Sequence, residues 1–311
     1  MKTNNEARVV RVAAVQVAPV LLDRDATLDR MEIWVARAKE RGAELVAFPE
    51  TFLPGYPTWL DYSPAAALWD HAGAKAVFAR LMENSVEVPG PAAERLARMA
   101  REHHVTLMVG VHERAGRTLY NSLLWFGPDG ALVNHHRKLV PTYTERLLWG
   151  QGDADGLRTV VVNGVSYGGL VCWEHWMPLA RQVLHDAGEE IHVASWPGVK
   201  DMHQVASRHY AFEGRCFVVA VGSLVRVRDL PAELPPLPEL AGEPDRLLIP
   251  GGSAIIGPDG AYLAGPVFGE ETLVVADCDL RAIARESLTL DVSGHYSRPD
   301  VFQLTVERRR R

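Results

Sequence analysis

The sequence predicts an α/β protein with a mixed, mostly buried β-sheet. Short runs rich in apolar and β-branched residues alternate along the 311-residue chain with longer segments of helical periodicity. Turn sequences join some of these runs directly, which predicts antiparallel hairpins added to a parallel sheet. No linker, repeat or low-complexity block breaks the pattern. We therefore expect a single domain over residues 1–311.

The first half of the chain alternates clearly between the two kinds of segment. A strand is expected at 9–17, followed by a helix at 25–41 whose apolar residues recur with helical spacing and which Gly42 ends. The other elements expected here are a strand at 45–48, a helix at 91–103, a strand at 105–111, and a hairpin of strands 119–126 and 131–138 around the turn 127–130.

The second half continues the alternation and adds one irregular segment. The expected elements are strands 159–162 and 165–171 around Asn163-Gly164, a helix at 177–187, a strand at 191–194, a helix at 201–215, and strands 217–222, 254–256, 262–264 and 273–278. Helix 201–215 carries Met202, Val205 and Phe212 on one face. Segment 228–250 is rich in Pro, Leu and Glu and is expected to form a long loop, because strand-like sequence resumes directly after it.

Composition indicates an ordinary globular protein and excludes several classes. Hydrophobic residues make up 47% of the chain and charged residues 23%. The net charge of −6 argues against binding to nucleic acid or to a membrane surface. No apolar run reaches the length of about 18 residues that a membrane span needs. Three widely separated cysteines and an N-terminus without the apolar core of a signal peptide predict a reducing, cytoplasmic location.

Three reactive side chains directly follow apolar strands, namely Glu50, Lys138 and Cys172. Ligand sites of α/β sheets form at the carboxyl ends of strands, so this placement suggests one shared site. Each residue also has a simpler explanation: Glu50 as a cap, Lys138 as a solvated edge charge and Cys172 as a small buried hydrophobe. Together, however, a carboxylate, an ammonium and a thiol are a set suited to covalent catalysis.

Chemistry assigns a role to each group. Cys172 lies between a strand and the start of a helix, where unpaired N–H groups are expected to favour its nucleophilic thiolate. A thiolate attacks an electrophilic carbon that is multiply bonded to nitrogen or oxygen. The carboxylate of Glu50 would transfer protons, and the ammonium of Lys138 would stabilise negative charge on the attacked group.

Sequence motifs around these residues resemble the three catalytic motifs of the nitrilase superfamily of carbon–nitrogen hydrolases. They are Phe48-Pro49-Glu50, His136-Arg137-Lys138-Leu139 and Val171-Cys172-Trp173-Glu174, and they occur in the same order with the same wide gaps. Further segments resemble the true nitrilase branch: 54–57, 141–146 with 149–153, 177–181, 251–253 and 294–300. The similarity extends from about residue 9 to residue 303.

This resemblance implies a four-layer αββα sandwich and a complete site. Cys172 would be the nucleophile, Glu50 the general base, Lys138 the charge stabiliser, and Glu145 a second glutamate that positions the site. The alternative for Glu145 is a surface charge paired with Arg146. No metal or organic cofactor is implied. The family also implies a homodimer or a larger spiral assembly, with residues 280–311 as a C-terminal extension used in subunit contacts.

The implied reaction is hydrolysis of an organic nitrile to a carboxylic acid and ammonia through a thioimidate and a thioester. An amidase or carbamoylase, a cyanide-degrading enzyme and a non-catalytic assembly protein are the alternatives. His175 resembles the residue of arylacetonitrile-hydrolysing and cyanide-degrading members, which favours aromatic or arylaliphatic substrates. Candidates to line an apolar substrate cleft, or else to pack in the core, are Tyr56, Trp59, Trp173 and Trp196, and His175 is a further candidate to contact the substrate.

Two pairs of adjacent histidines, 103–104 and 135–136, also invite a metal interpretation. Adjacent residues of a strand point to opposite faces of the sheet, so neither pair forms a chelate. We therefore predict no metal site.

Overall fold

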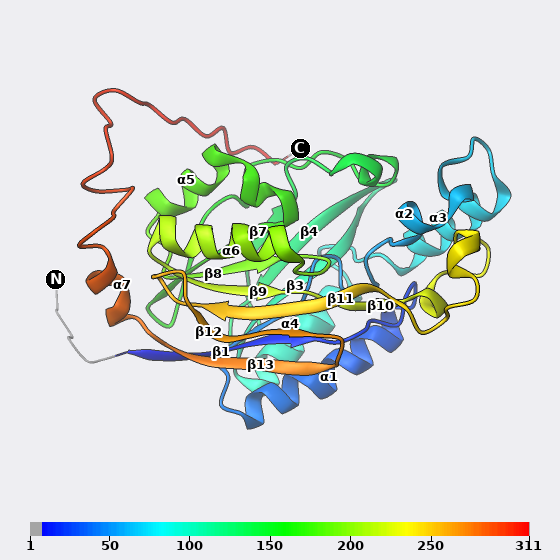
Figure 1. The fold of residues 1–311 in the computed structure, drawn as a ribbon, viewed down its shortest axis with the longest axis horizontal. Helices are drawn as coiled ribbons and strands as arrows, with labels where there is room; N and C mark the ends of the chain where they lie inside the picture. The colour runs from blue at the N-terminus through cyan, green and yellow to red at the C-terminus, as the bar shows by residue number, and fades with distance from the viewer. Residues whose placement is uncertain (1–7, 311) are drawn as a thin grey trace.

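The computed structural model describes residues 8–310, which form two β-sheets packed face to face between outer layers of helices (Figure 1). Helices α5 (Pro178–Asp186) and α6 (Asp201–Gly214) cover one outer face. Helices α1 (Arg24–Glu40) and α4 (Pro91–His103) cover the opposite one. The predicted four-layer αββα sandwich is confirmed.

The first sheet has the strand order β13-β1-β2-β3-β4-β5. Its parallel centre consists of β1, β2 and β3, and its other pairings are antiparallel. The strand bounds are β1 Val9–Gln16, β2 Leu45–Ala47, β3 Thr106–Ala115, β4 Thr118–Phe126, β5 Leu132–Arg137 and β13 Thr272–Asp279. The predicted hairpin of two strands around residues 127–130 is confirmed as β4 and β5.

The second sheet has the order β10-β11-β9-β8-β7-β6, with β12 paired to β11. Strands β7, β8 and β9 run parallel at its centre, and the others pair antiparallel. The strand bounds are β6 Val160–Val162, β7 Val165–Val171, β8 Ile191–Ser195, β9 Phe217–Val221, β10 Leu224–Arg226, β11 Leu247–Ile256 and β12 Tyr262–Phe268.

The core lies on both faces of the first sheet, which explains the continuous apolar runs of its strands. In β1, Val12 and Ala14 belong to the core between the two sheets, whereas Ala13 and Val15 belong to the core under α1 and α4. A strand buried on both faces needs apolar residues at successive positions. The continuous apolar runs of this sheet therefore reflect burial on both of its faces.

The apolar stripe predicted on α6 exists, but it faces away from the sheets. Met202, Val205 and Phe212 are 62%, 55% and 46% exposed. The helix packs instead through small and polar residues, including Ser207 and Tyr210. This orientation leaves an apolar surface on the outside of the molecule.

Two segments contain structure that the sequence did not predict. Helices α2 (Trp59–Tyr62) and α3 (Ala72–Asn84) lie between β2 and α4. The expected loop 228–250 contains short 3₁₀ turns and already enters β11 at Leu247. The two segments pack together (Figure 1), and the Leu237 N–H donates to the Tyr62 carbonyl at 2.8 Å.

The chain ends with helix α7 (Arg281–Glu286) and an extended tail. Among residues 8–310, no helix combines the length and apolar character needed to cross a bilayer. The polar N-terminal residues used above to argue against a signal peptide lie almost entirely outside the described part of the chain.

Candidate active site

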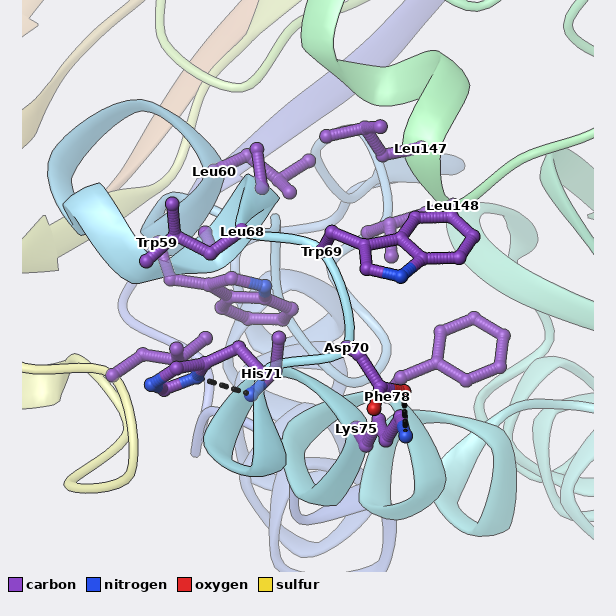
Figure 2. Close-up of a pocket in the computed structure, with 14 residues that line it drawn as sticks. Trp59, Leu60, Leu68, Trp69, Asp70, His71, Lys75, Phe78, Leu147 and Leu148 are labelled. Carbon is purple, nitrogen blue, oxygen red and sulfur yellow. Dashed lines mark hydrogen bonds and ion pairs between the residues drawn. The ribbon is translucent and has the colours of Figure 1, made fainter.

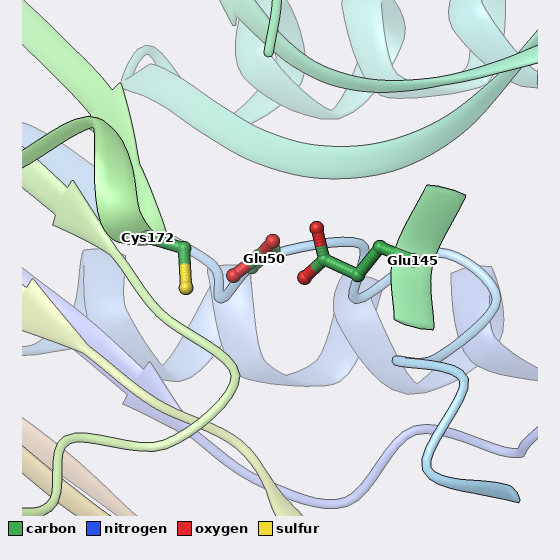
Figure 3. A group of neighbouring side chains, drawn as sticks. All are labelled: Glu50, Glu145 and Cys172. Atoms are coloured by element: carbon green, nitrogen blue, oxygen red, sulfur yellow. The ribbon is translucent and has the colours of Figure 1, made fainter. Parts of the chain in front are cut away.

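Glu50, Lys138 and Cys172 meet at one end of the two sheets. Glu50 follows β2, Lys138 follows β5, and Cys172 follows β7 of the other sheet. The Lys138 Nζ lies 2.8 Å from Glu50 Oε1 and 2.7 Å from Glu145 Oε2. Ligand atoms of Glu50, Glu145 and Cys172 all lie within 4.8 Å of one another (Figure 3). Residues far apart in the sequence therefore form one buried cluster.

The backbone around Glu50 is fixed by contacts from both sheets. The Glu50 N–H donates to the carbonyl of Trp196, which follows β8, at 3.2 Å. The Asn121 side chain donates to Glu50 Oε1 at 2.7 Å. Gly110 of β3 permits the close approach, because a Cβ there would lie 2.2 Å from the Pro49 carbonyl oxygen. These contacts aim the carboxylate at Lys138.

Glu145 lies in a short 3₁₀ helix, Tyr143–Leu147, and is 2% exposed. Its carboxylate accepts hydrogen bonds from the Thr142 N–H at 2.7 Å and from the Tyr56 hydroxyl at 2.9 Å, besides the Lys138 ammonium. The Arg146 side chain donates instead to the Pro141 carbonyl. Glu145 is therefore part of the buried cluster and not a surface charge paired with Arg146.

Cys172 adopts a left-handed backbone conformation, with φ of 50°, directly after β7. A side chain in this region costs conformational energy and needs support from its surroundings. Glu174 provides part of that support. Its carboxylate accepts from the Val171 N–H at 2.7 Å, from the Leu139 N–H at 2.8 Å and from His136 Nε2 at 3.0 Å. The ends of β5 and β7 are thereby joined beside the thiol.

The electrostatics of the cluster favour a resting thiol. Burial raises the pKa of Cys172 well above its usual range, the Glu50 carboxylate raises it further, and the Lys138 ammonium opposes both. The expectation that the start of a helix favours the thiolate is therefore wrong for the resting site, because desolvation and a neighbouring carboxylate outweigh it. A thiol in this state must lose its proton before it can act as a nucleophile.

Glu50 is poised to accept that proton. The pKa of Glu50 is raised to about 7, because burial and the Glu145 carboxylate raise it by more than the Lys138 ammonium and the Asn121 side chain lower it. Burial also disfavours the Lys138 ammonium, but the negative charges of Glu50, Cys172 and Glu145 raise the pKa of Lys138 above its ordinary value. Lys138 therefore stays charged, and the Glu50 carboxylate lies close enough to the Cys172 sulfur to exchange a proton with it.

A pocket of about 320 Å³ opens onto Cys172 and Glu145. Its wall combines aromatic and aliphatic side chains, namely Tyr56, Tyr62, Tyr143, Trp173, Leu248 and Ile249. The polar side chains around it include Asp61, Thr142, Lys200 and His203. The pocket is thus lined by apolar and polar side chains and reaches the Cys172 thiol, which suits a small organic substrate.

Tyr56 and Trp173 line this pocket, but three other residues expected there do not. Trp196 is fully buried and donates from Nε1 to Ser207 Oγ. His175 is buried, with Nδ1 2.7 Å from the Cys172 carbonyl oxygen and Nε2 facing His192. Trp59 packs in a separate apolar cluster and lines a second pocket of about 380 Å³ between α2 and α3 (Figure 2). Side-chain orientation at these positions depends on tertiary packing, which local sequence does not specify.

A family model for carbon-nitrogen hydrolases matches residues 11–285 of the chain. The chain belongs to the carbon–nitrogen hydrolase family.

Relatives of this hydrolase place it in the nitrilase branch of the family. It is 40% identical over 304 residues to nitrilase 1 of Arabidopsis thaliana, covering 96% of this chain and 86% of that protein. It is 39% identical to an aliphatic nitrilase of Sinorhizobium fredii, covering 96% and 95%. It is also 39% identical to a bifunctional nitrilase/nitrile hydratase of Lupinus angustifolius, covering 99% and 88%.

Solved structures of more distant proteins share the hydrolase fold. A superfamily member from Xanthomonas campestris superposes with a TM-score of 0.72 at 19% identity, covering 96% of this chain and 100% of that one. Nit3 of Saccharomyces cerevisiae gives a TM-score of 0.69 at 18% identity, covering 94% and 97%. At such identities the likeness concerns the fold.

The hydrolase site contains one group of side chains with the spacing of metal ligands, among the residues that the structure describes. The group is Glu50, Glu145 and Cys172. The ammonium of Lys138 forms ion pairs with both carboxylates and places a positive charge among the same atoms. A divalent cation there would face that charge at close range, so the donor set does not suit a metal.

Asn121 is a site residue that sequence reasoning missed. Besides binding Glu50, it accepts the Lys138 N–H at its backbone carbonyl at 2.7 Å. The signal was present, because Asn121 and Ser122 are polar residues inside an otherwise apolar strand of the hydrolase. A polar group buried in a central strand needs a partner, and here one partner is the carboxylate of Glu50.

Proposed function

We propose that this carbon–nitrogen hydrolase converts an organic nitrile into the carboxylic acid and ammonia. The observation that carries the proposal is the buried cluster in which Lys138 bridges Glu50 and Glu145 beside the Cys172 thiol. The relatives named as nitrilases favour a nitrile over an amide, since the same three groups would also suit an amidase.

The first half of the reaction forms a thioimidate. The Glu50 carboxylate accepts the Cys172 proton while sulfur adds to the nitrile carbon. One π bond of the nitrile breaks, and its electrons move onto nitrogen, which takes the proton back from Glu50. The Lys138 ammonium stabilises the negative charge that develops on nitrogen. Glu145 holds that ammonium in place through the 2.7 Å contact.

The second half releases the two products. Glu50 accepts a proton from a first water, whose hydroxide adds to the thioimidate carbon, and the nitrogen is protonated and leaves as ammonia. A thioester to Cys172 remains. A second water attacks it in the same way, so that the carboxylic acid leaves and the proton returns to sulfur. One nitrile and two waters thus yield one acid and one ammonia.

The pocket supports an aromatic or arylaliphatic substrate. Its aromatic and aliphatic wall, with Tyr56 and Trp173 nearest to the site residues, offers apolar surface to a ring. Its volume of about 320 Å³ far exceeds the size of cyanide and favours an organic nitrile over a cyanide-degrading activity.

The protein is further proposed to act as a homodimer or a larger assembly of its own copies. The exposed apolar surface of α5 and α6, with Leu179, Met202 and Val205 each more than half exposed, is the supporting observation. The C-terminal segment from residue 280 is the second candidate for subunit contacts. A reducing, cytoplasmic location fits a mechanism that requires Cys172 as a free thiol.

The test is the variant Cys172→Ala, compared with Cys278→Ala, which removes a buried thiol of β13. Benzonitrile, phenylacetonitrile, an aliphatic nitrile, cyanide and phenylacetamide are offered to each protein, and ammonia and acid are both measured. We expect nitrile turnover in the wild type and in Cys278→Ala, and none in folded Cys172→Ala. Persistent nitrile turnover in Cys172→Ala would refute the proposal.

A further inference from the structure

The wall of the pocket that opens onto Cys172 carries an ammonium that the mechanism above does not use. Among the described residues that line this pocket, Lys200 is the only lysine or arginine. Lys138, by contrast, is 1% exposed and belongs to the buried cluster. Polar groups in the wall of a substrate pocket fix the orientation of a bound molecule and select among molecules. Lys200 is therefore a candidate for substrate recognition.

The fold brings Lys200 to the edge of the sheet at which the thiol lies. Cys172 directly follows β7, and segment 197–200 follows β8. These two strands are parallel neighbours, with Val171 opposite Ser195 in the register. The carboxyl ends of adjacent parallel strands meet at one edge of a sheet, where ligand sites form. Lys200 thus comes from the strand next to the one that ends at Cys172.

The backbone at Lys200 is anchored independently of its side chain. The Val199 N–H donates to the Gly251 carbonyl of β11 at 2.7 Å, and the Gln204 N–H donates to the Lys200 carbonyl at 2.9 Å. The Gln204 side chain donates to the Val199 and Gly252 carbonyls at 2.9 and 2.6 Å. A substitution that changes only the Lys200 side chain therefore leaves these contacts in place.

The acidic side chains of the pocket wall already have hydrogen-bond donors. The Asp61 carboxylate accepts from the Thr144 hydroxyl at 3.0 Å. The Glu145 carboxylate accepts from the Lys138 ammonium at 2.7 Å. Within residues 8–310, by contrast, the Lys200 ammonium has neither an ion-pair partner nor a hydrogen-bond acceptor. An oxygen of a bound ligand can supply the acceptor that this ammonium lacks.

His203 is the other side chain of the wall that could carry a positive charge. The pKa of His203 is lowered from its usual value, because burial and the Lys200 ammonium outweigh a hydrogen bond to the Gly198 carbonyl. The ring is therefore mostly neutral near about pH 7. The positive charge of the pocket wall thus belongs to Lys200.

We propose that Lys200 is a specificity-determining residue whose ammonium binds a carboxylate of the substrate while the nitrile lies at Cys172. The substrate class is then an organic nitrile that also carries a carboxylate. Both ends must fit within about 320 Å³, which a single ring between nitrile and carboxylate allows. Hydrolysis consumes one such anion and two waters and yields one dicarboxylate and one ammonium ion. This inference rests on the proposed nitrile hydrolysis, because it names the substrate class of that reaction.

Paired substrates measure the contribution of the carboxylate. The meta and para isomers of (cyanomethyl)benzoate each carry a nitrile and a carboxylate, and the matching acetylphenylacetonitriles replace the carboxylate with a neutral group of similar size. We expect the wild type to hydrolyse at least one anionic isomer with a kcat/KM about 3- to 10-fold above that of its neutral partner, because an ion pair at a partly exposed site contributes modestly.

Lys200→Met removes the charge and keeps a side chain of similar length. It should lower kcat/KM for the preferred anion about 3- to 10-fold, mainly through KM, and change kcat/KM for the neutral partner less than about twofold. Lys39→Met is the matched control and should change neither value, because it removes the same charge from an exposed lysine of α1, in the opposite outer layer. A preference that is absent from the wild type for both isomers, or that persists in Lys200→Met, would overturn the inference.

Salt dependence tests the same contact in the unaltered protein. Raising sodium chloride from about 0.01 M to about 0.5 M screens an exposed ion pair, so kcat/KM should fall for the anionic substrate and change little for its neutral partner. Equal salt dependence of the two substrates would overturn the inference. Failure of the underlying function is distinguishable, because the wild type would then release no ammonia from the neutral acetyl compounds or from any other nitrile.

Discussion

Lys138 is the residue on which the site depends most, because it compensates two buried carboxylates at once. Glu50 and Glu145 are 0% and 2% exposed, and the ammonium contacts both. Without it, the two negative charges would lie close together in a buried site with no positive charge between them. Charge pairs of this kind are retained for chemistry as much as for stability, since a buried ion pair often gains little net stability.

The pKa of Glu50 leads to a prediction for the pH dependence of the reaction. The base must be ionised to accept the thiol proton, and burial raises its pKa to about 7. We expect kcat/KM for a nitrile to fall as pH decreases through about 7 and to level off above it. A profile that stays flat from about pH 5 to pH 8 would contradict the assigned base.

Asn121 offers a direct test of that assignment. Its hydrogen bond lowers the pKa of Glu50, so Asn121→Ala should move the acidic limb of the kcat/KM profile to higher pH. Thr27→Ala serves as the control, because its hydroxyl lies in α1 and bonds to Val20 and Asp23. An unshifted limb in folded Asn121→Ala would mean that another group controls the profile.

The residues of the buried cluster were predictable from the sequence, but their neighbours were not. Glu50, Lys138 and Cys172 each end a recognisable strand, and the motif resemblance added Glu145. Partners such as Asn121 depend on which strand lies beside which. The same reason explains why Trp59 and Trp196 were expected at the cleft, since hydrophobic periodicity does not specify which cavity a large side chain reaches.

Glycines in the strands and loops allow backbone segments to approach one another closely at the site. Gly110 of β3 contacts the backbone of Glu50, and a Cβ there would lie 2.6 Å from the Thr51 nitrogen. Gly152 similarly approaches the end of β5, where a Cβ would lie 2.5 Å from the Lys138 carbonyl oxygen. If an added Cβ lies closer than about 3 Å to a backbone atom, the backbone must move to relieve the clash.

Gly110→Ala is therefore expected to displace Glu50 and to reduce kcat about 10- to 100-fold. Gly242→Ala is the matched control, because a Cβ at that position meets no atom within 4 Å. Steady-state rates and melting temperatures of both variants test the prediction. Wild-type kcat in Gly110→Ala would show that the close approach of β3 does not set the position of the base.

Helix α5 contributes a pH-dependent part of the folding stability through His185. Burial lowers the pKa of this residue, but hydrogen bonds to Glu189 and Glu213 outweigh that effect and raise it to about 9. Because the folded pKa exceeds the ordinary value of 6.5, this stabilisation is complete below about pH 6.5 and is lost as pH rises through about 9. It amounts to about 3 kcal/mol.

Urea unfolding at several pH values measures this contribution. The wild type should lose stability between about pH 6.5 and pH 9, and His185→Gln should be less stable at low pH with a flatter dependence. An equal pH dependence in the wild type and in His185→Gln would exclude His185 as the source.

Helices were predicted correctly where the spacing of apolar residues agreed with a recognisable N-cap residue. Helix α1 has Asp23 as its N-cap and a regular buried stripe, and it was found within a residue of its bounds. Helix α3 buries only Val77 and Leu81 and was not predicted from the sequence. The start of β11 was hidden inside a proline-rich segment, because its pairing partners come from distant parts of the chain.

The assembled molecule leaves one outer layer of helices with an apolar surface, which motivates the proposed dimer. Val205→Glu would place a charge on that exposed surface. We expect it to shift the protein towards monomers in sedimentation velocity. Ile33→Glu is the control, since Ile33 is 53% exposed on α1 of the other outer layer and Val205 is 55% exposed. Equal sedimentation of the two variants would place the subunit contact elsewhere.

The whole fold was predictable because the motif resemblance supplied the division of the strands into two sheets, which local sequence patterns do not show. Alternating strands and helices indicated an α/β protein with a mixed sheet, but they did not show that the strands divide into two sheets. That division depends on pairings such as β1 with β13, which are separated by most of the chain. The resemblance of the motifs to those of a known family supplied it.

Trapping the covalent intermediate tests most directly whether sulfur, carboxylates and ammonium act together. The protein is mixed with phenylacetonitrile, or with the best nitrile of the panel, quenched with acid within a turnover, and digested for mass spectrometry. An acyl or imidoyl adduct on Cys172, absent from Cys216 and Cys278, is the predicted result. Turnover without any adduct on Cys172, or with the adduct on another cysteine, would contradict the account.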